Sequence, residues 1–200
     1  MSISAALVKD LREKCGAGMM DCKRALEETN GDLDEAVKLL RMKGMAAADK
    51  KSARAAEEGL VESYIHGGGK IGVLVEVNCE TDFVARNEEF RTFVHDVAMH
   101  IAASGPSYVS REQIPEAMVA AELEIYTAQA RETGKPETVL AKIAEGKLNK
   151  WYEQVTLLEQ PFVKDPDKTI DVLRRELVAK VGENIEVRRF ARFRLGEDLS

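Results

Sequence analysis

The sequence changes its hydrophobic period near residue 59, and this change constrains the fold more than any other feature. Between residues 7 and 40, apolar side chains recur every three or four positions, which is the spacing of amphipathic helices. After Gly59, apolar and polar residues alternate, which is typical of strands with one buried face. Helices that precede the strands, rather than alternate with them, favour the α+β fold class.

The helical part predicts a bundle of three short helices. The first carries an apolar stripe at residues 7–11 and is interrupted by Gly16. The second runs from about 19 to 28, and the third begins after Asp32, a good N-cap, and is expected to end at Gly44. Helices of this length are not stable alone in water, so they must pack against one another.

A segment rich in alanine and basic residues follows, and it has helix-forming composition but little large apolar surface. We interpret residues 45–57 as a connecting helix. The sequence therefore predicts an N-terminal three-helix domain at 1–44, this connector, and a core domain at 58–200 that contains the strands.

The core domain predicts a three-stranded antiparallel sheet packed with helices. Strands at 60–66 and 70–78 flank three glycines at 67–69, which suits a hairpin turn. A third strand at 185–195 would complete the sheet, because an isolated hairpin is only marginally stable. Helices are expected between the second and third strands, at about 88–103, 115–133, 136–152 and 169–181.

The faces of two strands can be assigned from their alternation. In the second strand one face is apolar throughout, and it carries Ile71, Val73, Val75 and Val77. In the third strand we expect Val187, Ala191 and Phe193 on one side. Phe190 would lie among arginines on the other side, which suits burial against another chain or a solvated basic face.

Charge and composition narrow the kind of partner. The chain of 200 residues has a net charge of -6, so it lacks the basic excess that nucleic-acid binding needs. No apolar run approaches membrane-spanning length, and the N-terminus lacks the pattern of a signal peptide. We expect a soluble cytoplasmic protein that binds another protein, with no direct nucleic-acid or membrane partner.

Cysteines and histidines do not form a recognisable site. Cys15, Cys22 and Cys79 are odd in number and lack C-x-x-C spacing, so they are interpreted as core residues rather than a disulfide framework or zinc ligands. The three histidines are not spaced as metal ligands. Neither a metal nor another cofactor is expected.

Two motifs allow a chemical interpretation that the sequence does not support well. The glycines at 67–69 lack a following G-K-[ST] and a helix start, so a turn is favoured over a phosphate loop. Cys79 follows a strand and could pair with a histidine, which leaves a cysteine-dependent hydrolase as one alternative. Such pairs arise by chance in most chains, so the sequence does not support an enzyme.

The junction between the second strand and the next helix is the most unusual segment. It reads N-C-E-T-D-F-V-A-R from residue 78 to 86. Thr81 or Asp82 could simply N-cap the helix, and Phe83 could be an ordinary core aromatic. From the residues alone, that structural interpretation is sufficient.

Four stretches resemble the elongation factor Ts family in its short form. They are G-A-G-M-M-D-C-K-R-A-L at 16–26, T-D-F-V-A-R at 81–86, E-Q-P-F-V-K-D at 159–165 and G-E-N-I-E-V-R-R-F at 182–190. They lie in the family's order and span nearly the whole chain. The resemblance implies a bacterial guanine-nucleotide exchange factor for the GTPase elongation factor Tu, active in translation elongation and not an enzyme.

The resemblance also implies site residues. The N-terminal helices would form a module similar to ubiquitin-associated (UBA) domains, which docks on the GTPase domain of elongation factor Tu. The matching contact positions are Arg12, Met19, Met20 and Lys23. Two methionines beside a glycine-rich turn would offer an adaptable apolar patch flanked by charge, although a buried methionine pair with two solvated charges is the alternative.

A second set of residues matches family positions that act beside the nucleotide bound to elongation factor Tu. Thr81, Asp82, Phe83 and Val84 would promote loss of Mg²⁺ and then of GDP, and the factor would stabilise the empty partner until GTP binds. A GTPase holds its nucleotide through Mg²⁺ and backbone donors, so an exchange factor must disturb those contacts. No covalent step is involved.

His66 resembles a further contact residue, although it could also be a simple exposed loop residue. Short-form members act as homodimers through their sheets, which implies a complex of two factors with two copies of the partner. The alternative from another class is a non-catalytic UBA-like adaptor in which the core domain only dimerises. That alternative explains the bundle but leaves Asp82 and Phe83 without a role.

Overall fold

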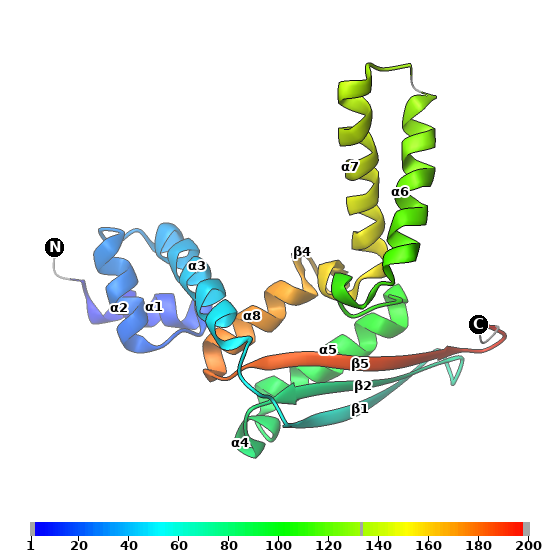
Figure 1. The fold of residues 1–200 in the computed structure, drawn as a ribbon. Helices are drawn as coiled ribbons and strands as arrows, with labels where there is room; N and C mark the ends of the chain where they lie inside the picture. Colours follow the sequence, from blue (N-terminus) through cyan, green and yellow to red (C-terminus); the bar gives the residue numbers. More distant parts are fainter. Residues whose placement is uncertain (1–2, 133, 198–200) are drawn as a thin grey trace. The chain divides into compact units, whose positions relative to one another are not determined.

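The first helices and the later sheet occupy the places that the hydrophobic period predicts. The computed structural model describes residues 3–132 and 134–197 (Figure 1). Its α+β class, with N-terminal helices followed by a three-stranded antiparallel sheet packed with helices, is confirmed.

The N-terminal half contains α1 (Ala5–Cys15), α2 (Met19–Glu28), α3 (Leu33–Lys51), β1 (Glu58–His66), β2 (Ile71–Cys79), α4 (Asp82–Ala85) and α5 (Glu88–Ser104). The C-terminal half contains η1 (Arg111–Gln113), α6 (Glu116–Arg131), α7 (Glu137–Val155), η2 (Leu157–Glu159), β3 (Pro161–Phe162), β4 (Asp165–Thr169), α8 (Ile170–Val181) and β5 (Ile185–Arg194). The strand order is β1-β2-β5, and β3 pairs with β4 separately.

The chain divides into two compact units. The first unit contains residues 1–61, 76–94 and 172–187, and the second contains 62–75, 95–171 and 188–200. The first unit therefore holds the N-terminal helices together with α4 and most of α8. The second holds the turn between β1 and β2, the α6–α7 hairpin and the end of β5.

The three N-terminal helices pack around a small core, as predicted. Local sequence signals explain both ends of α1 and the start of α3: Ser4 caps α1, Gly16 ends it in the left-handed region, and Asp32 caps α3 through two backbone amides. The buried core of the bundle consists of Val8, Leu11, Cys22, Ala25, Leu26 and Ala36. These residues come from all three helices, which is why none of the helices needs to be stable alone.

The prediction that the third helix ends at Gly44 is wrong. The helix α3 continues to Lys51, so no separate connecting helix spans 45–57. A β-carbon added at Gly44 would lie 3.0 Å from the β-carbon of Ala179 on α8. A side chain here would crowd Ala179, so glycine favours close packing of α3 against α8, and this offsets its cost of about 1 kcal/mol in a helix interior. The placement of a domain boundary near residue 44 stays a prediction.

The strands of the sheet follow the predicted alternation in β1 and β2. In β2 the side chains of Val73, Val75 and Val77 are buried, whereas Leu74 is exposed. Gly59 at the start of β1 has a φ of 146°, and a β-carbon there would lie 2.2 Å from the carbonyl oxygen of Val77. Only glycine fits this close approach of two strands.

The prediction for the last strand is partly wrong. Val187 is buried, but Ala191 and Phe193 are exposed, while Phe190 and Arg192 are half-buried. The buried side thus shifts by one residue within the strand. Arg188 and Arg189, which lie between these two parts of the strand, are both exposed. A strict period of two could not predict this shift.

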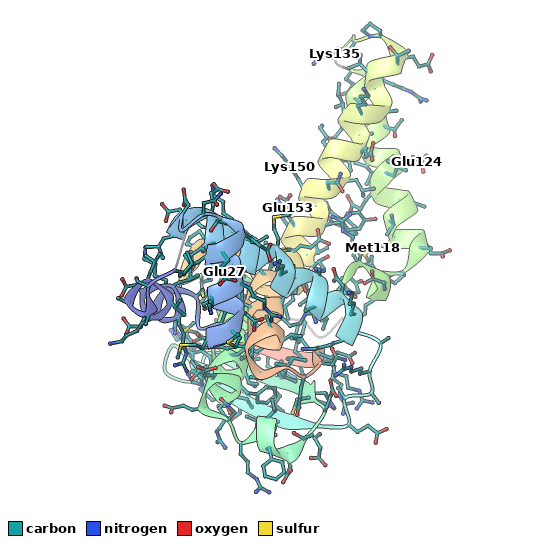
Figure 2. The ribbon with its side chains drawn as sticks, turned by 90° about the vertical axis from the view of Figure 1, so that its left-hand side faces the viewer. Glu27, Met118, Glu124, Lys135, Lys150 and Glu153 are labelled. Atoms are coloured by element: carbon teal, nitrogen blue, oxygen red, sulfur yellow. The ribbon has the colours of Figure 1, made fainter. Side chains whose placement is uncertain are left out.

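The helices α6 and α7 form an antiparallel hairpin in the second unit (Figure 1). Their predicted starts at Pro115 and Pro136 are correct to within one residue. Only Ala130 and Ala144 are buried within the two helices. Glu124 and Lys150 lie on opposite outer sides of the hairpin (Figure 2), so most of its surface faces solvent.

In residues 3–132 and 134–197, no helix has the length and apolar character needed to cross a membrane.

Candidate partner-binding surfaces

The predicted docking residues lie on α1 and α2, on either side of the turn at residues 16–18. Met19 and Met20 are the first residues of α2 and are 55% and 63% exposed. Arg12 in the last turn of α1 and Lys23 in α2 are also exposed. The alternative of a buried methionine pair is therefore wrong. We refer to Arg12, Met19, Met20 and Lys23 as the methionine surface.

The local sequence explains why this surface is exposed. Buried positions on α2 are Cys22, Ala25 and Leu26, so Met19 and Met20 fall outside the buried stripe. Gly18 is the N-cap of this helix, and it has no side chain with which to cap the first amides. Lys23 lies 3.9 Å from Glu27 one turn later, and at this exposure the ion pair contributes little to stability.

The segment at residues 81–84 forms a sharp corner between β2 and α5. Thr81 is the N-cap of the short helix α4, and its hydroxyl accepts a hydrogen bond from the Val84 amide at 3.4 Å. The structural prediction of an N-cap is therefore confirmed for Thr81. We refer to residues 80–85 as the Phe83 corner.

Phe83 is not a core aromatic. Its side chain is 81% exposed, the highest value among the exposed large hydrophobic residues in the described part of the chain. Exposing a phenyl ring to water is unfavourable by roughly 2 kcal/mol relative to burying it. Single exposed apolar residues are common on protein surfaces, but a phenyl ring provides a large contact area when a partner covers it.

The neighbours of Phe83 have different environments. Asp82 is half-exposed and forms an ion pair of 2.9 Å with Arg86 one turn later in the chain. Val84 is only 9% exposed, so its side chain anchors α4 to the first unit rather than facing outward. Of the four residues predicted here, Phe83 and Asp82 thus have side chains that face solvent.

The carboxylate of Glu183 holds the Phe83 corner, which the sequence interpretation missed. It accepts hydrogen bonds from the Glu80 amide at 3.1 Å, the Thr81 amide at 3.0 Å and the Thr81 hydroxyl at 2.7 Å. Hydrogen bonds to a charged acceptor are about twice as strong as neutral ones. The only available signal was the match at 182–190 to the family, which does not say what Glu183 contacts.

A second set of contacts joins the corner to the segment after α3. The Asn184 amide donates to Glu80 Oε1 at 2.6 Å, and its side-chain amide donates to the Arg54 carbonyl at 2.8 Å. Arg54 also forms an ion pair of 3.4 Å with Glu80. Asn184 is 3% exposed, so these hydrogen bonds are shielded from water.

His66 is the last residue of β1 and is exposed next to the turn at 67–69. Its Nδ1 atom lies 3.1 Å from the Tyr64 hydroxyl, and the two rings are stacked with centroids 5.9 Å apart. Tyr64 also contacts the edge of His95. These contacts give the His66 ring a defined orientation at the surface.

The environment of Cys79 argues against a nucleophile. Its side chain is buried, and burial followed by the charge of Glu183 raises the pKa of the thiol to about 11. Only the thiolate attacks a substrate, so this cysteine is almost entirely unreactive at neutral pH. Its Sγ donates to the Thr81 carbonyl at 3.2 Å, which gives it a structural role beneath the Phe83 corner.

The outer face of the sheet in the second unit is apolar and exposed. Ile65 of β1, Leu74 of β2 and Phe193 of β5 are 66%, 50% and 57% exposed. Ile65 packs over Gly72, since a β-carbon there would lie 3.3 Å from the Ile65 side chain. Three large apolar side chains on one side of a small sheet form a patch that is typical of protein interfaces.

Residues 3–132 and 134–197 contain no group of three or more His, Cys, Asp or Glu side chains that could hold a metal ion.

Known proteins of one family match this chain over nearly its full length. Residues 5–197 match the family model described as elongation factor TS. The chain is 63% identical to elongation factor Ts of Geobacter sulfurreducens, over all of this chain and 92% of that relative. It is 59% identical to elongation factor Ts of Carboxydothermus hydrogenoformans over 99% of this chain and 91% of that relative. For elongation factor Ts of Acetivibrio thermocellus the identity is 57%, over 98% and 92% of the two chains.

Proposed function

This chain belongs to the elongation factor Ts family and is an exchange factor for elongation factor Tu rather than an enzyme, and we propose that the Phe83 corner drives its nucleotide-release step. Like its bacterial relatives, it acts in translation elongation in the cytoplasm. The predicted family and exchange function are thus confirmed.

The exposed ring of Phe83 is the observation that carries this proposal. A phenyl side chain that is 81% exposed on an anchored helix can insert between side chains of a partner without first leaving a core. Asp82 places a carboxylate beside it. In this proposal the two side chains displace partner groups next to Mg²⁺, so the metal is lost and GDP then dissociates.

The methionine surface supplies most of the docking energy in the same proposal. Thioether side chains adapt to an uneven partner surface, and Arg12 and Lys23 add charge at the rim. His66 adds a further contact from the second unit. Thr81 and Val84 act within the protein, because they hold the corner in place.

Linkage explains how such a binder turns over. If the factor weakens GDP binding to elongation factor Tu, GDP weakens the binding of the factor by the same ratio. GTP, which refills the empty site, then displaces the factor.

Stopped-flow release of fluorescent GDP from elongation factor Tu tests the proposal, with the factor varied from below to above saturation. Phe83→Ala is expected to lower the maximal release rate roughly 10- to 100-fold, the range of a central interface aromatic. The concentration that gives half-maximal release should change less than about threefold. Equal losses in both quantities would show that Phe83 only contributes to docking.

We also propose that the protein is a homodimer that forms a complex with two copies of elongation factor Tu. The exposed sheet face that carries Ile65, Leu74 and Phe193 supports this proposal, because a second copy would bury it. Sedimentation equilibrium of the wild type and of Phe193→Asp tests it. The wild type is expected to be a dimer and the variant a monomer, and a monomeric wild type at micromolar concentration contradicts the proposal.

A further inference from the structure

We propose that Glu183 is a positioning residue for nucleotide release: its carboxylate fixes the backbone from which Phe83 projects. The inference rests on the function proposed above, since it requires Phe83 to act on the partner. It adds a residue that lies 100 positions further along the chain than Phe83 and is half-buried.

The first argument is that α4 cannot hold its own position. It has four residues, which is too short for a helix to be stable by itself. The Phe83 ring is largely exposed and so has few contacts within the protein that could fix it. The point from which the ring projects is therefore set by whatever holds the backbone on either side.

The second argument is the geometry of the Glu183 carboxylate. One of its oxygens accepts from two consecutive backbone amides, those of Glu80 and Thr81, and the other accepts from the Thr81 hydroxyl. The same hydroxyl accepts from the Val84 amide on the far side of Phe83. The hydrogen bonds thus run from the carboxylate, through Thr81, to both ends of the residue pair Asp82 and Phe83.

The third argument is that the anchor is itself well held. Glu183 lies between the end of α8 and the start of β5, where Gly182 ends the helix with a hydrogen bond of 3.0 Å to Val178. The next residue, Asn184, is buried and bonded to Glu80 and Arg54. Because the carboxylate of Glu183 is held in one place, it can in turn fix the backbone of the Phe83 corner.

Preorganisation explains why this matters for release. A side chain that is already in its bound position loses less conformational freedom when the complex forms, and more of its interaction energy acts on the partner. Loss of the anchor should leave docking on the methionine surface intact. It should reduce the maximal rate of GDP release, because the ring is then correctly placed only part of the time.

The main test uses Glu183→Gln, Phe83→Ala and the double variant in the GDP-release assay. Glu183→Gln is expected to lower the maximal rate roughly tenfold, with little change in the concentration for half-maximal release. If Glu183 acts through Phe83, the double variant should be as slow as Phe83→Ala alone, within about twofold. Effects that multiply in the double variant would overturn the inference.

A measurement without elongation factor Tu separates positioning from general stability. Hydrogen exchange of the full-length free protein should show protected amides at Glu80 and Thr81 in the wild type and faster exchange in Glu183→Gln. The amides of α5 should keep their protection. Loss of protection throughout the first unit would indicate unfolding and would overturn a positioning role.

If Glu183→Gln does not fold, two variants of Thr81 test the inference in its place. Thr81→Val keeps the shape but removes the hydroxyl that links Glu183 to Val84, and it should lower the maximal rate. Thr81→Ser keeps the hydroxyl and should retain most of the rate. Equal rates for these two variants would overturn the inference.

Phe83→Ala is the reference that separates the two proposals. If elongation factor Tu releases GDP as fast with Phe83→Ala as with the wild type, the proposed function fails. If GDP release is slow with Phe83→Ala but fast with Glu183→Gln, only the positioning role of Glu183 fails.

Discussion

The methionine surface and the Phe83 corner both expose large apolar side chains, but the two regions hold them differently. Met19 and Met20 begin a helix that has no side-chain cap, next to a turn of small residues. Phe83 lies on a capped turn whose backbone is bonded to a distant carboxylate. One surface consists of flexible side chains at a simple helix start, and the other presents a ring from an anchored backbone.

This difference matches the two separate tasks that we propose for these regions. Docking can use side chains that adapt to the partner, because many arrangements give similar contact area. Displacement of a group beside Mg²⁺ needs a side chain at one position, because a small shift would miss the target. Mutations in the two regions should therefore change different measured quantities.

The largest effect that would test this division is expected from Met19→Ala combined with Met20→Ala. Truncation of two exposed interface side chains should raise the concentration for half-maximal GDP release roughly 10- to 100-fold. The maximal rate at saturation should stay near the wild-type value. A reduced maximal rate, with unchanged helix content by circular dichroism, would contradict the assignment of docking and release to different regions.

Leucine replacements distinguish the methionine surface from the Phe83 corner more finely, because they keep apolar volume but change the shape of the side chain. Met19→Leu and Met20→Leu should each change the half-maximal concentration less than about threefold, since an adaptable surface tolerates such swaps. Phe83→Leu should lower the maximal rate about tenfold, because the planar ring is lost at a shaped contact. Titration of each variant in the GDP-release assay measures both quantities.

A smaller effect is expected from charge. Lys23→Ala should raise the half-maximal concentration about threefold at low salt and hardly at all at high salt, because exposed charges are screened. The effect of Phe83→Ala should not depend on salt. Release rates measured at low and at high ionic strength distinguish the two, and a salt-independent Lys23→Ala effect would count against a charged rim.

The smallest expected effect concerns the reactivity of two buried cysteine thiols. Cys22 belongs to the core of the three-helix bundle that carries the methionine surface, and Cys79 lies beneath the Phe83 corner. Burial raises the pKa of both Cys22 and Cys79 to about 11. Both folded pKa values exceed the unfolded value of about 8.5, so their contribution to stability is complete below pH 8.5 and is lost as the pH rises toward 11.

Alkylation with iodoacetamide compares the two regions through these thiols. Neither should react within minutes at pH 8, because the reaction requires local opening. Cys22 should react a few-fold faster than Cys79, since a three-helix bundle opens more readily than a central strand. Peptide mass spectrometry over hours identifies the order, and faster reaction of Cys79 would contradict the proposed rigidity of the corner.

Local patterns predicted much of the secondary structure and part of the site. The expected second helix at 19–28 coincides with α2, Asp32 caps α3 as predicted, and of the two candidates at 81–82 it is Thr81 that caps α4. The exposure of Phe83 could not be predicted, because an aromatic residue at a helix start is also common in cores. The resemblance to a family, rather than residue physics, pointed to its function.

Local sequence patterns were sufficient to predict the three N-terminal helices, the strands β1, β2 and β5 in their order, the buried face of β2, and the turn at 67–69, whereas the short strands β3 and β4 were not predicted. Periodicity, caps and glycines act over a few residues, so these features can be read from the chain. Tertiary structure decided that Gly44 is a packing site, that β5 shifts its buried side, and that Glu183 holds Thr81 across 102 residues. Such contacts depend on which elements pack together, and no local pattern contains that information.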